Sequence, residues 1–465
     1  MHSADRIFSA AAQPYDAREP EFKAIVLTVR ENDMYPLTER RNMPKALLPI
    51  ANRPMIWYIL QWLEQGGILD IKIVATRESE PDISNYIEVY KGKANITVKT
   101  LSDSNGTADV LRHMAPQIKS DVIVVPCDLL VDVPAVQFLD LFRIRRPALS
   151  TLFYEVMPSE GGGGSSKAKT PLPIIGIDQP TSRLVFLKDL DQESARNKRT
   201  EELSLPMSIV RRFPSMAMSD KMQDSHIYVM QKWILDYIVD HPEIESLQED
   251  LLPLLVSAQC NPDLLKSKQL DQYVRSAASE LRFAATNEAS AGQFGLTRVA
   301  KVNEDDAFSV FAYVRRGGIA GCADQIPRYC DLNYIATKIS TEARIDDSVK
   351  LANQTQVSGD SMVGASSQLG ERCSIKRSVV GAHCVIGRNV KIINSVIMDH
   401  VTIGDGVKIE SCVVCKLTKV GDNSQLMDCE IGAKVVVPNG SEFKAKSITF
   451  DDDLENADDL FTEFA

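Results

Sequence analysis

Three short runs in the first third of the chain carry side chains suited to binding a phosphate or a metal ion. They are NMPKALLPIANRPM, which contains Lys45, the tripeptide Gly106-Thr107-Ala108, and VVPCDLL, which contains Asp128. A lysine offers positive charge to a phosphate, and an aspartate is a hard oxygen ligand for magnesium. Asp128 also follows a buried strand, and ligand groups lie at the carboxyl ends of the strands in a parallel sheet. Lys45 could therefore contact a phosphate, and Asp128 could contact a metal ion or a nucleotide.

Each of these residues also has a structural interpretation that stays open. For Lys45 we favour a lysine that lines an empty cleft, whereas Asp128 equally well caps the element after its strand. Gly106-Thr107 opens a helix that continues through Ala108. Thr107 is therefore a candidate N-cap, because threonine is a preferred residue at that position. A lone Gly-Thr-Ala is weak support for a binding site.

Two further groups of residues, one of cysteines and one of histidines, could do chemistry, and each contains a pair separated by 17 residues. Cys412-x-x-Cys415 has the spacing of half a zinc site, but no second pair accompanies it. Cys412 and Cys429 are separated by the longer spacing, as are His383 and His400. Stacked structural side chains on a repeating fold explain both pairs. A histidine acting as general base in acyl transfer is the alternative for the second pair.

The elements that position the first cleft alternate between strand and helix. Apolar runs predict strands at 22–29, 71–75, 96–101 and 122–126, and helical spacing predicts helices at 53–65, 82–90 and 108–117. Such alternation predicts right-handed crossovers and a mainly parallel sheet. Later predicted elements are strands at 151–156, 173–177 and 227–230 and helices at 232–239 and 245–260. Gly161–Ser166 is expected to be a flexible loop within this α/β domain.

A different pattern begins near Ile345. Aliphatic residues recur in triplets spaced by six, and successive triplets are offset by the same 17-residue spacing. The fourteen positions of this pattern are Val363, Leu369, Ile375, Val380, Ile386, Ile392, Ile397, Ile403, Ile409, Val414, Val420, Leu426, Ile431 and Val437. Three short strands per coil, each with one inward aliphatic side chain, predict a parallel β-helix.

Composition and charge exclude several classes of protein. The chain has 465 residues, of which 44% are hydrophobic and 25% charged, as in ordinary globular proteins. No apolar run approaches the ~20 residues of a membrane-spanning helix, and the first residues do not resemble a secretory signal. Nine scattered cysteines predict reduced thiols and a cytosolic protein. The net charge of −11 argues against nucleic acid as the main ligand.

Seven acidic residues and no basic ones lie in Asp451–Ala465, interleaved with Leu454, Leu460, Phe461 and Phe464. We expect this acidic tail to be a solvated, disordered segment, because so much like charge opposes packing. Docking on a basic partner is the second hypothesis for it.

The first strand, Lys45, Gly106-Thr107-Ala108 and Asp128 together resemble the sugar-nucleotide pyrophosphorylases. The resemblance implies a Rossmann-like α/β nucleotidyltransferase domain followed by a left-handed β-helix. It also implies that the lysine neutralises phosphate charge, that the Gly-Thr-Ala turn lies against the nucleotide and that the aspartate holds magnesium.

One part of that family's site is missing from this sequence. The family's first loop reads Leu-Ala-Ala-Gly-x-Gly-Thr-Arg, and its glycines allow backbone amides to approach a triphosphate. Here the loop after the first strand contains no glycine, and Arg30–Met34 includes the acids Glu31 and Asp33. We therefore expect a vestigial nucleotide cleft at Lys45, Gly106, Thr107 and Asp128, with no catalytic residue, no metal site and no cofactor.

A second resemblance is more specific. ANRPMIWYIL, DSHIYVM, SLQEDLLPLLV and LGERCSIKRSVVGAHCVIG resemble the gamma-subunit family of the eukaryotic translation initiation factor 2B complex, over most of residues 21–448. That complex is the guanine nucleotide exchange factor for the GTPase initiation factor 2. The related epsilon subunit carries an additional C-terminal helical domain, for which the short segment after Ile448 leaves no room.

The resemblance implies a non-catalytic scaffold and regulatory subunit in the cytosol. Its expected partners are the epsilon-type subunit, the alpha, beta and delta types and the initiation factor 2 GTPase, without nucleic acid or membrane. The expected organisation is a flexible lead 1–20, an α/β domain 21–335 with a flexible loop near 157–172, a β-helix 336–448 and an acidic tail 449–465. The competing hypothesis is a sugar-1-phosphate nucleotidyltransferase that uses Lys45 and Asp128.

Overall fold

A computed structural model describes residues 21–28, 34–39, 42–101, 106–156, 173–188, 205–276, 308–339 and 343–449. Several expectations concern segments outside these ranges. They are the lead 1–20, the loop residues Arg30–Asp33, the segment 157–172 with its glycine run, and the acidic tail from residue 450 onward.

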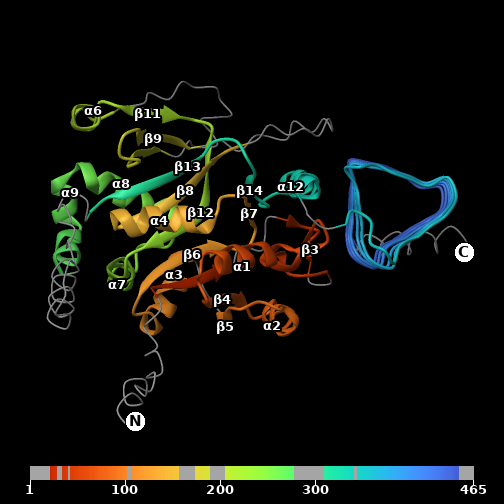
Figure 1. Cartoon of the computed structure of the whole chain (residues 1–465), viewed down its shortest axis with the longest axis horizontal. Coiled ribbons are helices and arrows are strands. Elements are labelled where there is room, and N and C mark those ends of the chain that lie inside the picture. The colour runs from red at the N-terminus through yellow and green to blue at the C-terminus, as the bar shows by residue number, and fades with distance from the viewer. Residues whose placement is uncertain are drawn as a thin grey trace, which may run out of the picture.

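The first domain is built on a seven-stranded sheet with the order β13-β8-β12-β6-β1-β4-β5 (Figure 1). Strands β6, β1, β4 and β5 are parallel, as predicted, whereas β12 runs antiparallel to both β6 and β8. The strands are β1 (Phe22–Leu27), β4 (Asp70–Thr76), β5 (Asn95–Leu101), β6 (Asp121–Pro126), β8 (Leu149–Glu155), β12 (Met222–Met230) and β13 (Val310–Arg315). The predicted α/β class is confirmed.

Helices bury both faces of this sheet. Helices α1 (Met55–Gln65) and α4 (Ala135–Arg145) cover one face, and α3 (Thr107–Met114), α7 (Lys232–Asp240) and α8 (Leu252–Cys260) cover the other. Within β1, Ala24 and Val26 pack on the face covered by α1 and α4, whereas Ile25 packs on the face covered by α3, α7 and α8. This two-residue alternation explains why the strand is a continuous apolar run, because both of its faces are buried.

Two predicted helices differ in detail from those observed. Arg53–Pro54 forms β3 and pairs with β2 (Pro49–Ile50), so the helix predicted from residue 53 begins at Met55. The segment predicted as one helix over 245–260 divides into a single π-helical turn, η4 (Leu247–Leu251), and α8. Such single turns occur mostly where a helix is locally distorted, often beside a functional site.

The remaining elements of this domain are short or peripheral. They are η2 (Lys45–Leu47), α2 (Glu80–Val89), η3 (Ala115–Gln117), β7 (Leu129–Val131), β9 (Ile174–Asp178), β10 (Leu184–Lys188), α6 (Met207–Arg212), β11 (Met216–Ser219), α9 (Pro262–Ser267), β14 (Ala320–Cys322) and α12 (Ile326–Ile339). Among the described helices, none is long and apolar enough to cross a membrane.

The second domain is the predicted β-helix. Three six-stranded parallel sheets form the sides of a triangular prism, seen end-on in Figure 1. The predicted aliphatic residues point inward: Ile375, Ile392 and Ile409 pair in register and are fully buried. The predicted offset between coils holds from the second coil onward, whereas Leu351 of the first coil pairs with Leu369.

We name the three sides by their strands. Side 1 contains β15 (Lys350–Leu351), β18 (Gln368–Leu369), β21 (Val385–Ile386), β24 (Thr402–Ile403), β27 (Lys419–Val420) and β30 (Val436–Val437). Side 2 contains β16 (Gln356–Val357), β19 (Ser374–Lys376), β22 (Lys391–Ile393), β25 (Lys408–Glu410), β28 (Gln425–Met427) and β31 (Glu442–Lys444). Side 3 contains β17 (Met362–Val363), β20 (Val379–Val380), β23 (Val396–Ile397), β26 (Val413–Val414), β29 (Glu430–Ile431) and β32 (Ser447–Ile448).

Side 3 of the prism is packed against the α/β domain, with α12 between them (Figure 1). The outward side chains of Val379, Val396 and Val413 are 4%, 4% and 2% exposed, in one apolar cluster with Tyr329 and Leu332 of α12. On side 1 the equivalent residues, such as Thr402, are exposed. Helix α12 also runs through residues 335 and 336, where the sequence suggested a domain boundary.

Candidate functional site

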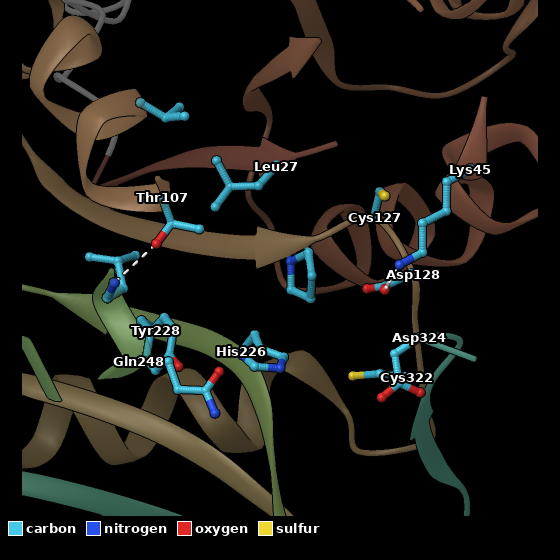
Figure 2. A pocket seen from close by; sticks show the side chains of 13 residues that line it. Leu27, Lys45, Thr107, Cys127, Asp128, His226, Tyr228, Gln248, Cys322 and Asp324 are labelled. Atoms are coloured by element: carbon cyan, nitrogen blue, oxygen red, sulfur yellow. Dashed lines mark hydrogen bonds and ion pairs between the residues drawn. The ribbon is translucent and has the colours of Figure 1, made fainter. Parts of the chain in front are cut away.

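The structure brings three of the four predicted site residues to one pocket at the carboxyl end of the parallel strands (Figure 2). Lys45 begins η2, Thr107 begins α3, and Asp128 follows shortly after the end of β6. The fourth residue, Gly106, is the N-cap of α3 and does not line the pocket. The pocket has a volume of about 130 Å³. Its lining consists of Leu27, Lys45, Thr107, Val110, Pro126, Cys127, Asp128, His226, Tyr228, Leu247, Gln248, Cys322 and Asp324.

Lys45 and Asp128 form an ion pair inside this pocket. The Lys45 Nζ atom lies 2.8 Å from Asp128 Oδ2, and the two side chains are only 2% and 11% exposed. Figure 2 shows the ammonium and carboxylate pointing toward one another. Buried charges in this arrangement neutralise each other, and separating them is costly. The two groups expected to meet phosphate and metal are therefore in direct contact with each other.

A second carboxylate, Asp324, lines the same pocket and was missed by sequence reasoning. It lies between β14 and α12, and its carboxylate pairs with Arg328 at 3.1 Å. Burial raises the pKa of Asp324; Arg328 lowers it and nearby Asp128 raises it. No motif marks this aspartate, because it reaches the pocket only through the pairing of β14 with β7. With one lysine and two carboxylates in its lining, the pocket is a poor environment for a triphosphate.

The Gly106-Thr107-Ala108 turn packs against the segment that precedes η4. The Ala108 amide donates to the Glu245 carbonyl at 3.0 Å, and a Cβ atom at Gly106 would lie 2.2 Å from that carbonyl oxygen. The Thr107 hydroxyl accepts a hydrogen bond from the Leu247 amide at 3.0 Å. The N-cap interpretation of Thr107 is wrong, because Gly106 occupies that position and Thr107 is the first helical residue.

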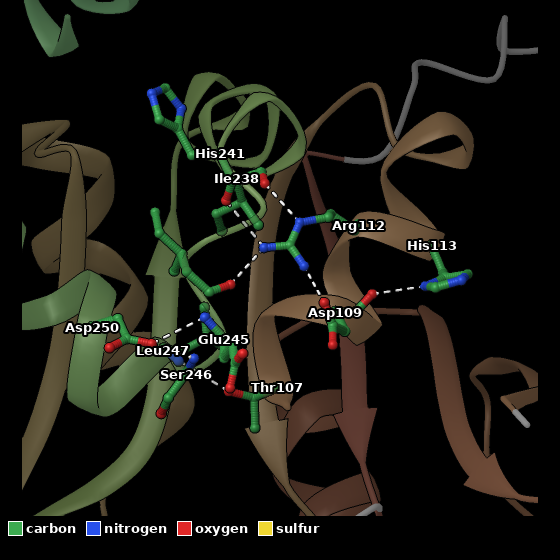
Figure 3. A network of polar contacts seen from close by, with 11 residues as sticks. Thr107, Asp109, Arg112, His113, Ile238, His241, Glu245, Ser246, Leu247 and Asp250 are labelled. Carbon is green, nitrogen blue, oxygen red and sulfur yellow. Dashed lines mark hydrogen bonds and ion pairs between the residues drawn. The ribbon is translucent and has the colours of Figure 1, made fainter. Parts of the chain in front are cut away.

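Arg112 links helix α3 to the segment between α7 and η4 (Figure 3). Its guanidinium donates to the carbonyls of Ile238 at 2.9 Å and His241 at 3.1 Å, and it also contacts the Ile244 carbonyl and the Asp109 carboxylate. These contacts satisfy carbonyls at the end of α7. Together with the contacts of Ala108 and Thr107, they join the start of α3 to the segment between α7 and η4.

A strand irregularity directs His226 toward the pocket. The pairing of β12 with β8 shifts register between Asp224 and Tyr228, and His226 has φ of 59°, which non-glycine residues adopt infrequently. Buried Asp224 stabilises this bulge: its carboxylate accepts from the His226 amide at 3.0 Å, the Thr151 hydroxyl at 3.1 Å and the Tyr228 hydroxyl at 2.6 Å. The short sequence DSHIYVM contains no spacing that predicts a bulge.

The cysteines of the β-helix are buried, and Cys412 and Cys429 lie on neighbouring coils, as their spacing predicts. The Cys412 sulfur accepts from the Cys429 amide at 3.3 Å, and Cys412 belongs to the prism interior. Cys415 instead packs in the cluster between the prism and the α/β domain, so the two members of Cys412-x-x-Cys415 lie on opposite sides of one strand. Across the described part of the chain, no three potential ligands are grouped to hold a metal ion.

His383 and His400 form the predicted stack on the outside of the prism. Their ring centroids are 4.9 Å apart with an interplanar angle of 8°, and both side chains are exposed. This arrangement agrees with repetition of the coil rather than with a pair of rings converging on one substrate atom.

Comparison with known protein families agrees with this architecture. A model described as nucleotidyl transferase matches residues 32–162, and a model described as the eIF2B subunit epsilon LbH domain matches residues 342–443. The eIF2B subunit gamma of Schizosaccharomyces pombe is 30% identical over 360 residues, which cover 76% of this chain and 74% of that protein. The chain belongs to the eIF2B subunit gamma family.

Other members of the exchange-factor group are similar over different lengths. The eIF2B subunit gamma of Dictyostelium discoideum is 27% identical over 368 residues, covering 72% of this chain and 81% of that protein. The eIF2B subunit epsilon of S. pombe is 29% identical over 174 residues, covering 35% of this chain and 25% of that protein. These two gamma subunits match most of the chain, and the prediction of a gamma-type chain is confirmed.

Proposed function

We propose that this gamma-family chain is a non-catalytic, regulatory subunit of the guanine nucleotide exchange factor for eIF2. The observation that carries the non-catalytic part is the buried Lys45–Asp128 ion pair. Nucleotidyl transfer requires cations beside the phosphates and carboxylates free to hold a metal ion. Here the lysine and the aspartate satisfy each other, so neither is available in this conformation.

The donor set does not fit a magnesium ion. Magnesium requires an octahedral shell of hard oxygen atoms around it. Asp128 is paired with Lys45, and Asp324 is paired with Arg328. The ammonium group of Lys45 already supplies the positive charge that Asp128 would otherwise seek from a metal. We therefore derive no catalytic step through a metal at this pocket.

The regulatory part of the proposal rests on family membership and on the exposed sides of the prism. The chain would bind the epsilon-type subunit through its α/β domain and subunits of the alpha, beta and delta types through its β-helix, in the cytosol. The outward residues of sides 1 and 2, such as Val385, Lys391 and Lys419, are exposed and leave flat surfaces for such contacts. Through these contacts the chain would orient eIF2 for exchange by the epsilon-type subunit.

We also propose two structural domains, with α12 as their shared element. The domain boundary predicted between residues 335 and 336 lies within this helix. Tyr329 donates to the Pro49 carbonyl at 2.5 Å, while the α12 side chains Leu332 and Ala336 belong to the cluster that includes side 3. The division therefore falls after Ile339, and α12 belongs structurally with the α/β domain.

The direct test of the regulatory role measures release of labelled GDP from eIF2. The purified chain, the epsilon-type subunit and the two together are compared at equal concentrations. We expect the chain alone to leave the intrinsic release rate unchanged and the pair to exceed the epsilon-type subunit alone. Exchange by the isolated chain, or a pair no faster than the epsilon-type subunit, contradicts the proposal.

The non-catalytic part has a separate test. The chain is incubated with magnesium, each nucleoside triphosphate and sugar 1-phosphates, and pyrophosphate release is measured. We expect no release above that of an Asp128→Asn variant. Turnover by the unaltered chain that this substitution abolishes would establish the nucleotidyltransferase alternative.

A further inference from the structure

Strand β5 forms an open edge of the seven-stranded sheet, at the lower margin of the α/β domain in Figure 1. Among the described strands, only β4 pairs with it. The opposite edge, β13, is covered: the Ala312 amide donates to the Ser182 carbonyl at 3.0 Å, and Phe311 forms a bridge with Arg183. An open edge of seven residues presents backbone groups to which a further strand can add.

The outward backbone groups of β5 belong to every second residue. The Asn95 amide donates to the Leu69 carbonyl at 2.7 Å, so Asn95 directs its backbone groups toward β4. Successive residues of a strand alternate in this direction, so Ile96, Val98 and Thr100 direct theirs outward. Within the described ranges, no hydrogen bond from another segment reaches the backbone of these three residues. The edge therefore offers a row of amides and carbonyls to an added strand.

One face of this edge carries three lysines, Lys23 of β1, Lys72 of β4 and Lys99 of β5, which we call the lysine strip. In register, Lys72 pairs with Ile25 and Lys99 pairs with Val74, and both apolar partners pack in the core beneath α3. Lys72 is buried, and its Nζ atom donates to Gln117 Oε1 at 2.8 Å. Burial lowers the pKa of Lys72 most, Lys23 and Lys99 also lower it, and Asp70 raises it. The three ammonium groups are therefore close enough to act on one another.

The lysine strip has more positive than negative charge. Asp70 is the one carboxylate among the described residues in ion-pair contact with it, and it lies 3.1 Å from Lys23 Nζ. Lys91 and Lys93, both exposed, immediately precede the strand. The edge is thus basic in a chain whose net charge is −11. Because opposite charges across an interface favour association, its complement is an acidic segment.

The other face of the edge is apolar. Ile96 and Val98 are half-buried and belong to the core that includes Tyr86 and Ile87 of α2. Side chains of a strand point alternately to the two faces of a sheet. A strand added beside β5 would therefore place every second side chain near Ile96 and Val98 and the others near Lys99. A segment that matches both faces alternates apolar and acidic residues.

We propose that β5 is a docking edge for an extended segment of another protein in which acidic and apolar residues alternate. The segment adds an eighth strand to the sheet, with its carboxylates beside Lys72 and Lys99 and its apolar side chains beside Ile96 and Val98. A nucleic acid would supply negative charge but no backbone ladder for β5. A second copy would bring two basic edges together, and lysines on edge strands oppose such pairing.

A short peptide tests the proposal on the full chain, independently of exchange activity. The probe is a seven-residue peptide that alternates glutamate and valine, which matches the length of β5. A rearranged peptide, with all glutamates before the valines, keeps the composition and the charge. Fluorescence anisotropy measures binding, and amide exchange at Val98 and Thr100 is followed by NMR. We expect slower exchange at both amides with the alternating peptide, and binding of the rearranged peptide about tenfold weaker or less.

One pair of variants tests the charge. Lys99→Glu should weaken binding of the alternating peptide by about tenfold or more, because it places a carboxylate beside the carboxylates of the peptide. Lys350→Glu makes the same change of net charge on side 1 of the prism, where Lys350 is exposed, and should leave binding unchanged. Equal weakening by the two variants would show long-range attraction and contradict docking at β5.

A second pair of variants tests the backbone ladder. Thr100→Pro removes an outward amide but no hydrogen bond to β4, and proline is tolerated on an edge strand in that position. It should weaken binding by about threefold to tenfold, whereas Thr100→Ala keeps the amide and should bind as the unaltered chain does. Equal affinity of these two variants would show attraction by charge without strand addition. Thermal unfolding checks that every variant remains folded.

Four further results would overturn the proposal. The first is no saturable binding of the alternating peptide at up to about 1 mM. The second is equal binding of the rearranged peptide, and the third is tighter binding of a single-stranded oligonucleotide of the same charge. The fourth is slow exchange at Val98 and Thr100 without peptide. If that protection is independent of protein concentration, it assigns the edge to a segment of this chain, and if it increases with concentration, it assigns the edge to a second copy.

Discussion

At the scale of single residues, the pocket is defined by charges that satisfy one another. Lys45 and Asp128 come from separate elements and meet at 2.8 Å in a nearly buried contact. A buried pair of this kind contributes little net stability over an apolar pair, but removal of one partner leaves an uncompensated charge. The contact therefore constrains the cleft more strongly than an exposed ion pair would.

This predicts a large cost for breaking the pair. Asp128→Ala should lower the free energy of unfolding by about 3–5 kcal/mol, because the Lys45 ammonium would remain buried without its partner. Urea denaturation measures the change. The matched control is Asp132→Ala, whose partner Arg315 lies at the same 2.8 Å but whose pair of side chains is 37% and 28% exposed. That change should cost about 0–1 kcal/mol, and equal losses at the two sites would contradict the interpretation.

Asp324 predicts a pH dependence with a defined sign. Burial, the largest influence, raises the pKa of Asp324 above its usual 3.8 in the folded chain. A carboxyl group of this kind favours folding below its unfolded pKa, and that contribution is lost as pH rises through the folded pKa. The stability of the unaltered chain relative to Asp324→Asn should therefore fall as pH rises above 3.8. Denaturation of both chains across this window checks it, and the opposite slope would contradict the assignment.

The sequence indicated part of this site. Asp128 was predicted because it follows a buried strand, and Lys45 because of the run around it. Their direct contact was not predictable, since it depends on how η2 packs across the carboxyl end of β6. No sequence pattern marked Asp324 or His226 as a pocket residue. Asp324 reaches the pocket through the pairing of β14 with β7, and His226 reaches it through the bulge in β12.

At the scale of elements, the two domains differ in how far local pattern determines structure. The stacked coils of the β-helix repeat the same environment. The positions of its inward aliphatic residues can therefore be predicted from the 17-residue spacing of the sequence. In the α/β domain, boundaries depend on distant partners: α1 begins at Met55 because Arg53–Pro54 pairs with β2. The same applies to α3, whose first residue, Thr107, accepts a hydrogen bond from the Leu247 amide of η4.

The joint between α3 and η4 can be tested at Thr107. Thr107→Ala removes the hydroxyl that accepts from the Leu247 amide at 3.0 Å, leaving that amide without this partner. We expect a loss of about 1–3 kcal/mol in the free energy of unfolding. Thr107→Ser keeps the hydroxyl and should retain most of the stability. Equal losses in calorimetry of the two variants would show that the methyl group, and not the hydrogen bond, matters.

At the scale of the whole molecule, the prism and the α/β domain share one apolar cluster. Side 3 contributes Val379, Val396 and Val413 to it, and α12 contributes Tyr329 and Leu332. The Asn52 side chain also donates to the Val380 carbonyl at 3.1 Å across the joint. The β-helix is therefore anchored along one side, while its other two sides face outward.

Charge substitutions on two sides of the same prism test this anchoring. Val396→Asp would place a carboxylate in the joint, where an unpaired charge is strongly unfavourable, and should destabilise the chain by at least about 2 kcal/mol. Val385→Asp lies on side 1, where Val385 is 45% exposed, and should change stability by less than about 0.5 kcal/mol. Urea denaturation measures the stability of the two variants, and small-angle scattering measures whether the β-helix stays against the α/β domain. A similar small effect at both sites would mean that side 3 is not anchored.

Helix α12 has one further consequence for how this molecule can respond to its surroundings. Asp324, just before its first turn, borders the pocket, and Tyr329 and Leu332 further along it support the prism. A substitution that displaced the start of this helix would therefore affect both the pocket and the interface with the β-helix.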